Sequence, residues 1–134
     1  MGKNKNKGGK GPKDPMANTK TMGKEGMKII RNIAFGTYNI YEEGHIFRNL
    51  DFVKAILFEV NKRLTDCCIH ITAMEYAYSN SQDNNVLSLL HRDKKSYDAY
   101  MLIKQTLESI IITGGDTGFL WVLANKLPPY RFNI

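Results

Sequence analysis

The chain has 134 residues, of which 43% are hydrophobic and 24% charged, and it carries a formal net charge of +6. This length allows one domain with a tail and excludes two domains of ordinary size, while the apolar fraction excludes disorder throughout. No apolar run approaches the roughly 18 residues of a membrane span, and the first residues lack the apolar block of a secretion signal. We therefore expect a protein that is neither secreted nor inserted in a membrane.

The excess positive charge lies at the N-terminus. Residues 1–28 hold eight Lys and two acidic residues, and the other residues hold 11 basic and 11 acidic side chains. This segment is also rich in Gly and has too few apolar residues to offset the entropy lost on ordering it. We therefore predict a flexible basic arm over residues 1–26, and we expect that deleting residues 1–23 leaves the body folded.

The lysines of this arm are the candidate binding residues of the chain. A run of Lys side chains binds polyanions by releasing their counterions, so the expected ligand is nucleic acid or an acidic protein partner. A solubility tail that contacts nothing specific is the alternative interpretation. The lysines concerned are Lys3, Lys5, Lys7, Lys10, Lys13, Lys20 and Lys24.

Beyond the arm, apolar residues recur at spacings of three and four, which indicates helices. The first expected helix runs from Lys24 to Tyr41, with Gly36 inside it and Gly44 as its stop. The strongest pattern follows over about 49–78 and predicts one long central helix. The apolar positions that keep the spacing there are Leu50, Val53, Leu57, Val60, Leu64, Cys67, Ile71, Met74 and Tyr78.

Two features describe this long helix further. Asn49 can cap its first turn, and Asp51 suits the positive end of the helix dipole. Phe52, Ile56 and Phe58 widen the apolar stripe beyond the seam that a two-stranded coiled coil needs. A central bundle helix with several neighbours is therefore expected, and a homotypic coiled coil remains the alternative.

Polar residues over 79–85 predict a loop after the long helix. A short helix over 86–90 and a longer one over 96–112 follow, and the charged residues 91–95 between them leave open whether the chain bends. The β-branched end of the second helix makes a strand over 109–113 the competing interpretation.

The glycines Gly114 and Gly115 end that helix, and Asp116 or Thr117 caps a last short helix that runs to Lys126. Pro128 and Pro129 then leave 128–134 as an extended tail. The predicted fold is an all-α bundle of four to five helices over residues 27–127.

No residue pattern predicts a cofactor, a metal or a catalytic site. Cys67 and Cys68 are adjacent, which suits a reducing compartment, and only Cys67 shares a helix face with His70, so four convergent metal ligands are not expected. The Gly-rich residues 112–118 lack the Lys that completes a phosphate-binding loop, and no nucleophile elbow is present. We therefore interpret Cys67 as an inert buried thiol and expect the protein not to be an enzyme.

Three classes of function remain. The first is a structural protein of a virion, in the capsid or at a phage head–tail junction, whose arm engages nucleic acid or an acidic partner. The second is a ribosome-associated or other RNA-binding protein, and the third is a small enzyme or an accessory subunit of one. The balanced charge of the body favours the first class, because proteins embedded in RNA also carry basic side chains over their folded surface.

The first class sets the expected surroundings of the protein. Its partners would be other structural proteins of the same assembly, with nucleic acid bound through residues 1–28 and no membrane contact. We expect a homo- or hetero-oligomer that is located in the virion, or in the host cytoplasm during assembly.

Overall fold

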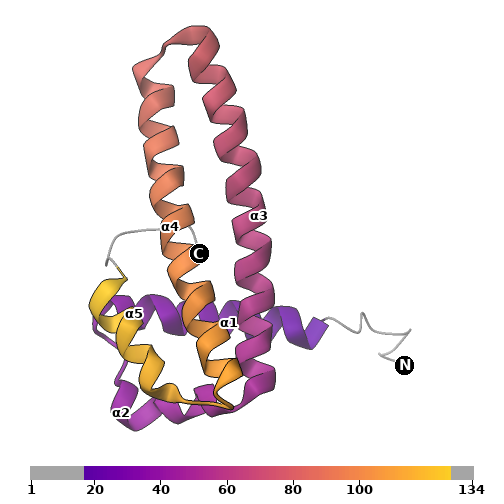
Figure 1. Ribbon diagram of the computed structural model, residues 1–134, viewed down its shortest axis with the longest axis vertical. Helices are drawn as coiled ribbons and strands as arrows, with labels where there is room; N and C mark the ends of the chain where they lie inside the picture. The colour runs from indigo at the N-terminus through magenta and orange to yellow at the C-terminus, as the bar shows by residue number, and fades with distance from the viewer. Residues whose placement is uncertain (1–16, 128–134) are drawn as a thin grey trace, which may run out of the picture.

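The computed structural model describes residues 17–127, and this part of the chain is all-α (Figure 1). The predicted helical fold with a long central helix is confirmed, and a second long helix lies beside the first. The elements in chain order are α1 (Ala17–Phe35), α2 (Ile40–Glu43), the 3₁₀ helix η1 (Gly44–Arg48), α3 (Leu50–Ser81), α4 (Asn84–Ile112), the 3₁₀ helix η2 (Thr117–Phe119) and α5 (Leu120–Lys126).

Helix α1 begins within the predicted arm, so the structure differs from a flexible segment over residues 1–26. Residues 17–26 are helical, and Gly23 and Gly26, one turn apart, are buried against α3. A Cβ atom at Gly23 would lie 2.7 Å from the carbonyl oxygen of Ala55, and one at Gly26 would lie 2.2 Å from the Ile56 side chain. These glycines therefore allow close helix packing, although in the sequence they resemble marks of flexibility. Residues 1–16 lie outside the described residues.

Helix α1 ends earlier than the periodicity predicts. Gly36 has a φ of 77°, a left-handed conformation that glycine adopts without strain, and the Thr37 N–H donates to the Asn32 carbonyl. Gly36 is thus the stop of α1, where the sequence predicted an interior position. The chain then turns into α2, which Asn39 caps, and Tyr41 belongs to that short helix.

Helices α3 and α4 form a long antiparallel hairpin. The predicted cap is confirmed, since the Asn49 side chain accepts hydrogen bonds from the N–H groups of Asp51 and Phe52. Only Gln82 and Asp83 separate the two helices, so the predicted loop over 79–85 shrinks to two residues. Gln82 takes the left-handed conformation and the Asp83 side chain caps α4, which lets the neighbouring polar residues join the helix ends.

Helix α4 is continuous, so the chain has neither the bend considered at 91–95 nor the strand considered over 109–113. It ends at Ile112, just before the predicted stop at Gly114 and Gly115, both of which have positive φ. Of the two caps predicted for the last helix, Asp116 caps the 3₁₀ helix η2 that precedes α5, because its side chain accepts a hydrogen bond from the Gly118 N–H.

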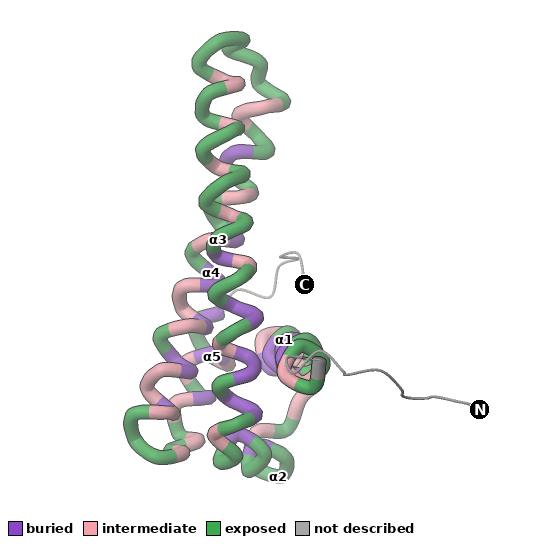
Figure 2. The backbone as a smooth tube through the Cα atoms, turned by 90° about the vertical axis from the view of Figure 1, so that its right-hand side faces the viewer, coloured by how far each residue is buried: buried purple, intermediate pink, exposed green. Residues whose placement is uncertain are grey.

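The core lies at the base of the hairpin, where α1 crosses it and α5 packs on α1 and α4 (Figures 1 and 2). Farther along, α3 and α4 pack only on each other, and Leu90 is the single buried residue of range 65–95. The expected bundle with several neighbours therefore describes only the lower half of α3. The core residues include Met27, Ile30, Ile33, Phe47, Val53, Ile56, Val60, Tyr100, Ile103, Leu107, Ile110, Leu120 and Leu123.

Candidate functional site

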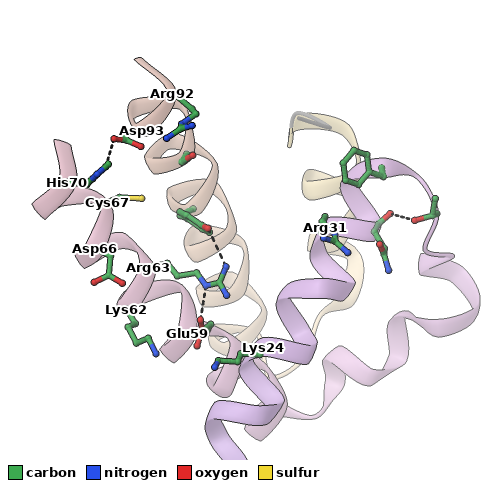
Figure 3. Close-up of a pocket in the computed structure, with 15 residues that line it drawn as sticks. Lys24, Arg31, Glu59, Lys62, Arg63, Asp66, Cys67, His70, Arg92 and Asp93 are labelled. Carbon is green, nitrogen blue, oxygen red and sulfur yellow. Dashed lines mark hydrogen bonds and ion pairs between the residues drawn. The ribbon is translucent and has the colours of Figure 1, made fainter. Parts of the chain in front are cut away.

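An open cleft of about 1310 Å³ lies between α1 on one side and the α3–α4 hairpin on the other (Figure 3). Three helices contribute charged side chains to it, because α1 crosses the hairpin and leaves a concave angle above the crossing. The charged and titratable lining residues are Lys24, Arg31, Glu59, Lys62, Arg63, Asp66, Cys67, His70, Arg92, Asp93 and Tyr100.

Four exposed cations line this cleft, and we call them the rim cations. They are Lys24 and Arg31 on α1, Lys62 on α3 and Arg92 on α4. Lys24 and Arg31 share a helix face because seven residues make two turns. No ion pair among residues 17–127 involves a rim cation. Their charges are therefore available to an anionic ligand.

The floor of the cleft holds an ion pair between the buried Glu59 and the partly buried Arg63. The Arg63 Nε donates to Glu59 Oε2 at 2.7 Å, and its Nη1 donates to the Tyr100 hydroxyl of α4 at 3.4 Å. Burial alone would lower the pKa of Arg63, but the hydrogen bonds to Glu59 and Tyr100 raise it above the ordinary value. The guanidinium therefore stays charged and holds α3 to α4.

Glu59 owes its burial to α1. Its side chain lies beneath Gly23, where a Cβ atom would come within 3.0 Å of the Glu59 Cβ. Only 3% of the residue is exposed. Its Oε1 is buried and has no hydrogen-bond partner among the described residues, although Oε2 accepts from Arg63.

At the upper end of the cleft, Cys67 and His70 lie one turn apart on α3, and the His70 Nδ1 contacts Asp93 Oδ2 of α4. A thiol, an imidazole and a carboxylate are the components of a cysteine nucleophile with its base. However, burial and the charge of Asp93 raise the pKa of Cys67, so at neutral pH the thiol stays protonated. This cluster is therefore poorly suited to nucleophilic attack.

The structure modifies the interpretation of the cysteines. Cys67 is only half-buried, so it is less covered than the buried thiol predicted from its seam position, and Cys68 is exposed. Residues 17–127 contain no group of three or more His, Cys, Asp or Glu side chains that could hold a metal ion.

Two of the predicted binding lysines lie in the described part of the chain. Lys24 lines the cleft, and Lys20 is an exposed residue one turn earlier on α1. The predicted residues outside the described part are Lys3, Lys5, Lys7, Lys10 and Lys13.

Sequence reasoning missed most of the cleft. Arg31 could have been found, because it follows Lys24 by seven residues on the same helix. Lys62 and Arg92 have no such local signal, since they reach the cleft only through the pairing of α3 with α4. The burial of Glu59 has no local signal either, because it depends on the crossing of α1.

Comparison with known proteins gives no match to a family model, to a curated protein or to a solved structure. Among the helices of residues 17–127, none has the length and apolar character that crossing a membrane requires.

Proposed function

We propose that the protein is a structural component of a large nucleic-acid-containing assembly, in particular of a virion capsid or head–tail junction. The observation that carries this proposal is the distribution of charge. The basic N-terminal residues lead directly into α1, and on that helix Lys24 and Arg31 line the cleft. Cationic groups are therefore concentrated along one segment and one concave surface, where a polyanion can bind by releasing counterions.

The rest of the body supports protein contacts within such an assembly. Three of its large exposed apolar side chains, those of Phe35, Tyr41 and Trp121, line one shallow pocket near the base, and apolar side chains gathered in this way are typical of surfaces that meet protein neighbours. Near the base, the rings of Tyr41 and Trp121 pack edge to face with centroids 5.1 Å apart. Among residues 17–127, the large apolar side chains that are exposed belong to Phe35, Tyr41, Ile46, Phe58, Ile69, Tyr76, Leu89, Ile112 and Trp121.

An RNA-binding protein, ribosome-associated or not, is the second candidate. The rim cations favour it, because proteins embedded in RNA carry basic side chains on their folded surface as well as on their tails. A small enzyme or accessory subunit is less favoured, since the raised pKa of Cys67 opposes a thiolate nucleophile.

Sedimentation distinguishes the two leading candidates. The full chain carrying an affinity tag is produced in its native host, and the large particles are separated on a gradient. Co-sedimentation with capsid proteins supports the virion proposal, and co-sedimentation with ribosomal RNA supports the second candidate. If the chain stays at the top of the gradient and sediments with neither kind of particle, both candidate functions are contradicted.

A binding titration tests the polyanion contact on which both candidates depend. With about four phosphates contacted, the affinity of the full chain for a labelled single-stranded oligonucleotide should fall roughly 50-fold between about 50 and 200 mM salt. An affinity that does not change over this range would show that binding does not depend on phosphate contacts.

A further inference from the structure

The unpartnered oxygen of Glu59 is the least expected feature of the cleft. A buried carboxylate oxygen without a hydrogen bond loses its hydration and gains nothing in return, so such atoms are rare in folded proteins. Arg63 donates to Oε2, and Oε1 stays buried without a donor in a residue that lines the cleft, so it can accept a hydrogen bond from a molecule in the cleft that reaches it. A ligand that fits the floor therefore carries a hydrogen-bond donor, N–H or O–H.

The rim cations suit a different chemical group in the ligand. Four exposed cations on three helices lie around the floor, against one exposed carboxylate, that of Asp66, and cations of this kind bind phosphate oxygens. A free phosphate satisfies only the rim, because a fully ionised phosphate brought to the floor would meet the charge of Glu59. The cleft therefore suits a ligand that carries phosphates on one side and a hydrogen-bond donor on the other.

Single-stranded nucleic acid has this arrangement. Its phosphates follow one edge of the chain while its unstacked bases project away from them and offer amino or imino N–H groups. In a duplex the pairing groups of the bases are occupied by the opposite strand. An acidic peptide fits less well, since its backbone N–H groups lie between its carboxylates and cannot approach Glu59 without them.

We propose that the cleft binds a single strand of nucleic acid, with its phosphates on the rim cations and a base N–H donating to Glu59 Oε1. Arg63 acts as a positioning residue that holds the carboxylate from its other oxygen. This inference rests on the proposed function, and it adds that the folded body binds the strand in addition to the N-terminal lysines.

The first experiment separates the cleft from the arm in the full chain. Fluorescence anisotropy measures binding of a labelled dC12 oligonucleotide to the double variant Arg31→Ala with Lys62→Ala. The matched control, Lys54→Ala with Lys126→Ala, removes the same charge at exposed positions that do not line the cleft. We expect about tenfold weaker binding for the cleft variant and less than about twofold for the control, because only the cleft variant loses phosphate contacts.

The outcomes are distinct. If the cleft variant and the control bind equally, the arm alone holds the strand, and the inference fails while the proposed function stands. If the unaltered chain binds neither the oligonucleotide nor poly-glutamate, both fail. If poly-glutamate binds more tightly than the oligonucleotide and is weakened by the cleft variant, the ligand is an acidic protein and the inference is wrong.

The second experiment tests the contact at the floor. An abasic oligonucleotide of the same length keeps the phosphates and loses the base donors, so it should bind about tenfold more weakly than dC12, as expected for one lost hydrogen bond to a charged group. Glu59→Gln should weaken dC12 binding similarly, and it should not weaken the binding of inorganic polyphosphate, which loses a repulsive charge and no hydrogen bond. Circular dichroism verifies that this variant is folded, and the abasic comparison needs no variant. Equal affinities for dC12 and the abasic strand would overturn the proposed base contact.

Discussion

At the residue scale, the packing of α1 on α3 depends on two missing side chains. Gly23 and Gly26 bring the helices close enough to bury Glu59 beneath α1 and to shape the cleft floor. In the sequence, glycines among lysines resemble a flexible segment, because composition does not reveal which side of a helix will meet another backbone. Their role becomes visible only when Ala55 and Ile56 are placed opposite them.

The substitution Gly26→Ala should destabilise the protein by up to about 2 kcal/mol. Alanine favours a helix by about 1 kcal/mol over glycine, but overpacking a fully buried contact costs about 1–3 kcal/mol. The added methyl would lie 2.2 Å from Ile56 Cγ1, and Ile56 has no free space because it is completely buried. Urea unfolding of the variant measures the loss.

The double variant Gly26→Ala with Ile56→Ala is the control for this steric argument. Ile56→Ala removes the atoms that the new methyl would meet, and the methyl fills part of the space that the substitution opens. The double variant should therefore lose less stability than the sum of the two single variants. Additive losses would mean that the two side chains do not compete for the same volume.

The titrating groups of the interior predict loss of stability at alkaline pH. Burial raises the pKa of Cys67 above the ordinary thiol value of 9.0, and it raises the pKa of Tyr38 and Tyr100 above the ordinary phenol value of 10.0. As the pH rises, each of these side chains therefore loses its proton at a lower pH in the unfolded chain than in the folded protein. The stabilisation is therefore complete below about pH 9 and is lost as the pH rises through the folded pKa values.

Urea unfolding at about pH 8 and pH 10.5 tests this dependence. The free energy of unfolding should be lower at the higher pH, and Tyr100→Phe should reduce the difference, because phenylalanine has no proton to lose. A free energy that stays constant between the two pH values would contradict the predicted direction.

At the scale of elements, the α3–α4 hairpin changes character along its length. The periodicity of α3 is unbroken, yet its lower half has α1, η1 and α4 as neighbours and its upper half has α4 alone. Polar contacts supplement the apolar seam there, with His70 meeting Asp93 and Lys94 meeting Glu75 at 3.6 Å. We therefore expect the base of the hairpin to hold most of its stability.

Two substitutions in the same seam measure this gradient. Leu64→Ala should cost about 2–5 kcal/mol, because Leu64 is 7% exposed and leaves a cavity in packed surroundings. Ile71→Ala should cost less than about 1.5 kcal/mol, since Ile71 is only half-buried and water reaches the space it leaves. Chemical unfolding of both variants provides the comparison. Equal costs would indicate that the upper hairpin is covered as fully as the base.

At the scale of the whole molecule, one segment, α1, both carries part of the basic N-terminal charge and packs in the core. Lysines of the N-terminal region extend into a helix that belongs to the core, so the basic segment and the folded body are not separate units. Lys24 illustrates this overlap, because it was predicted as an arm residue and it lines a cleft of the body.

Two truncations locate the boundary between the basic N-terminal segment and the folded body. Deleting residues 1–16 should change the free energy of unfolding by less than about 0.5 kcal/mol, since Met1 and Met16 are the only large apolar side chains among them. Deleting residues 1–23 removes the first turns of α1 and should cost at least about 1 kcal/mol, or a drop of about 4–8 °C in melting temperature. This revises the expectation from sequence that residues 1–23 are dispensable. Identical melting temperatures for the two truncations would restore it.

The sequence by itself determined the elements with strong local signals. Periodicity determined the long helix α3, and Asn49 determined its cap. The glycines at 114 and 115 determined the end of α4, and the polar pair that follows narrowed the next cap to Asp116 or Thr117. These signals are local because a helix face and its capping hydrogen bonds involve residues within a few positions of one another.

The tertiary structure alone decided where α1 begins, how much of the α3–α4 hairpin extends past the core and which charged side chains line one cleft. Each of these depends on contacts between residues distant in the chain, such as Gly26 with Ile56 or Arg63 with Tyr100. Charge could be counted from the sequence, but a cleft arises only when helices cross. The rim cations and the buried carboxylate of Glu59 are therefore properties of the packing of α1 against α3 and α4.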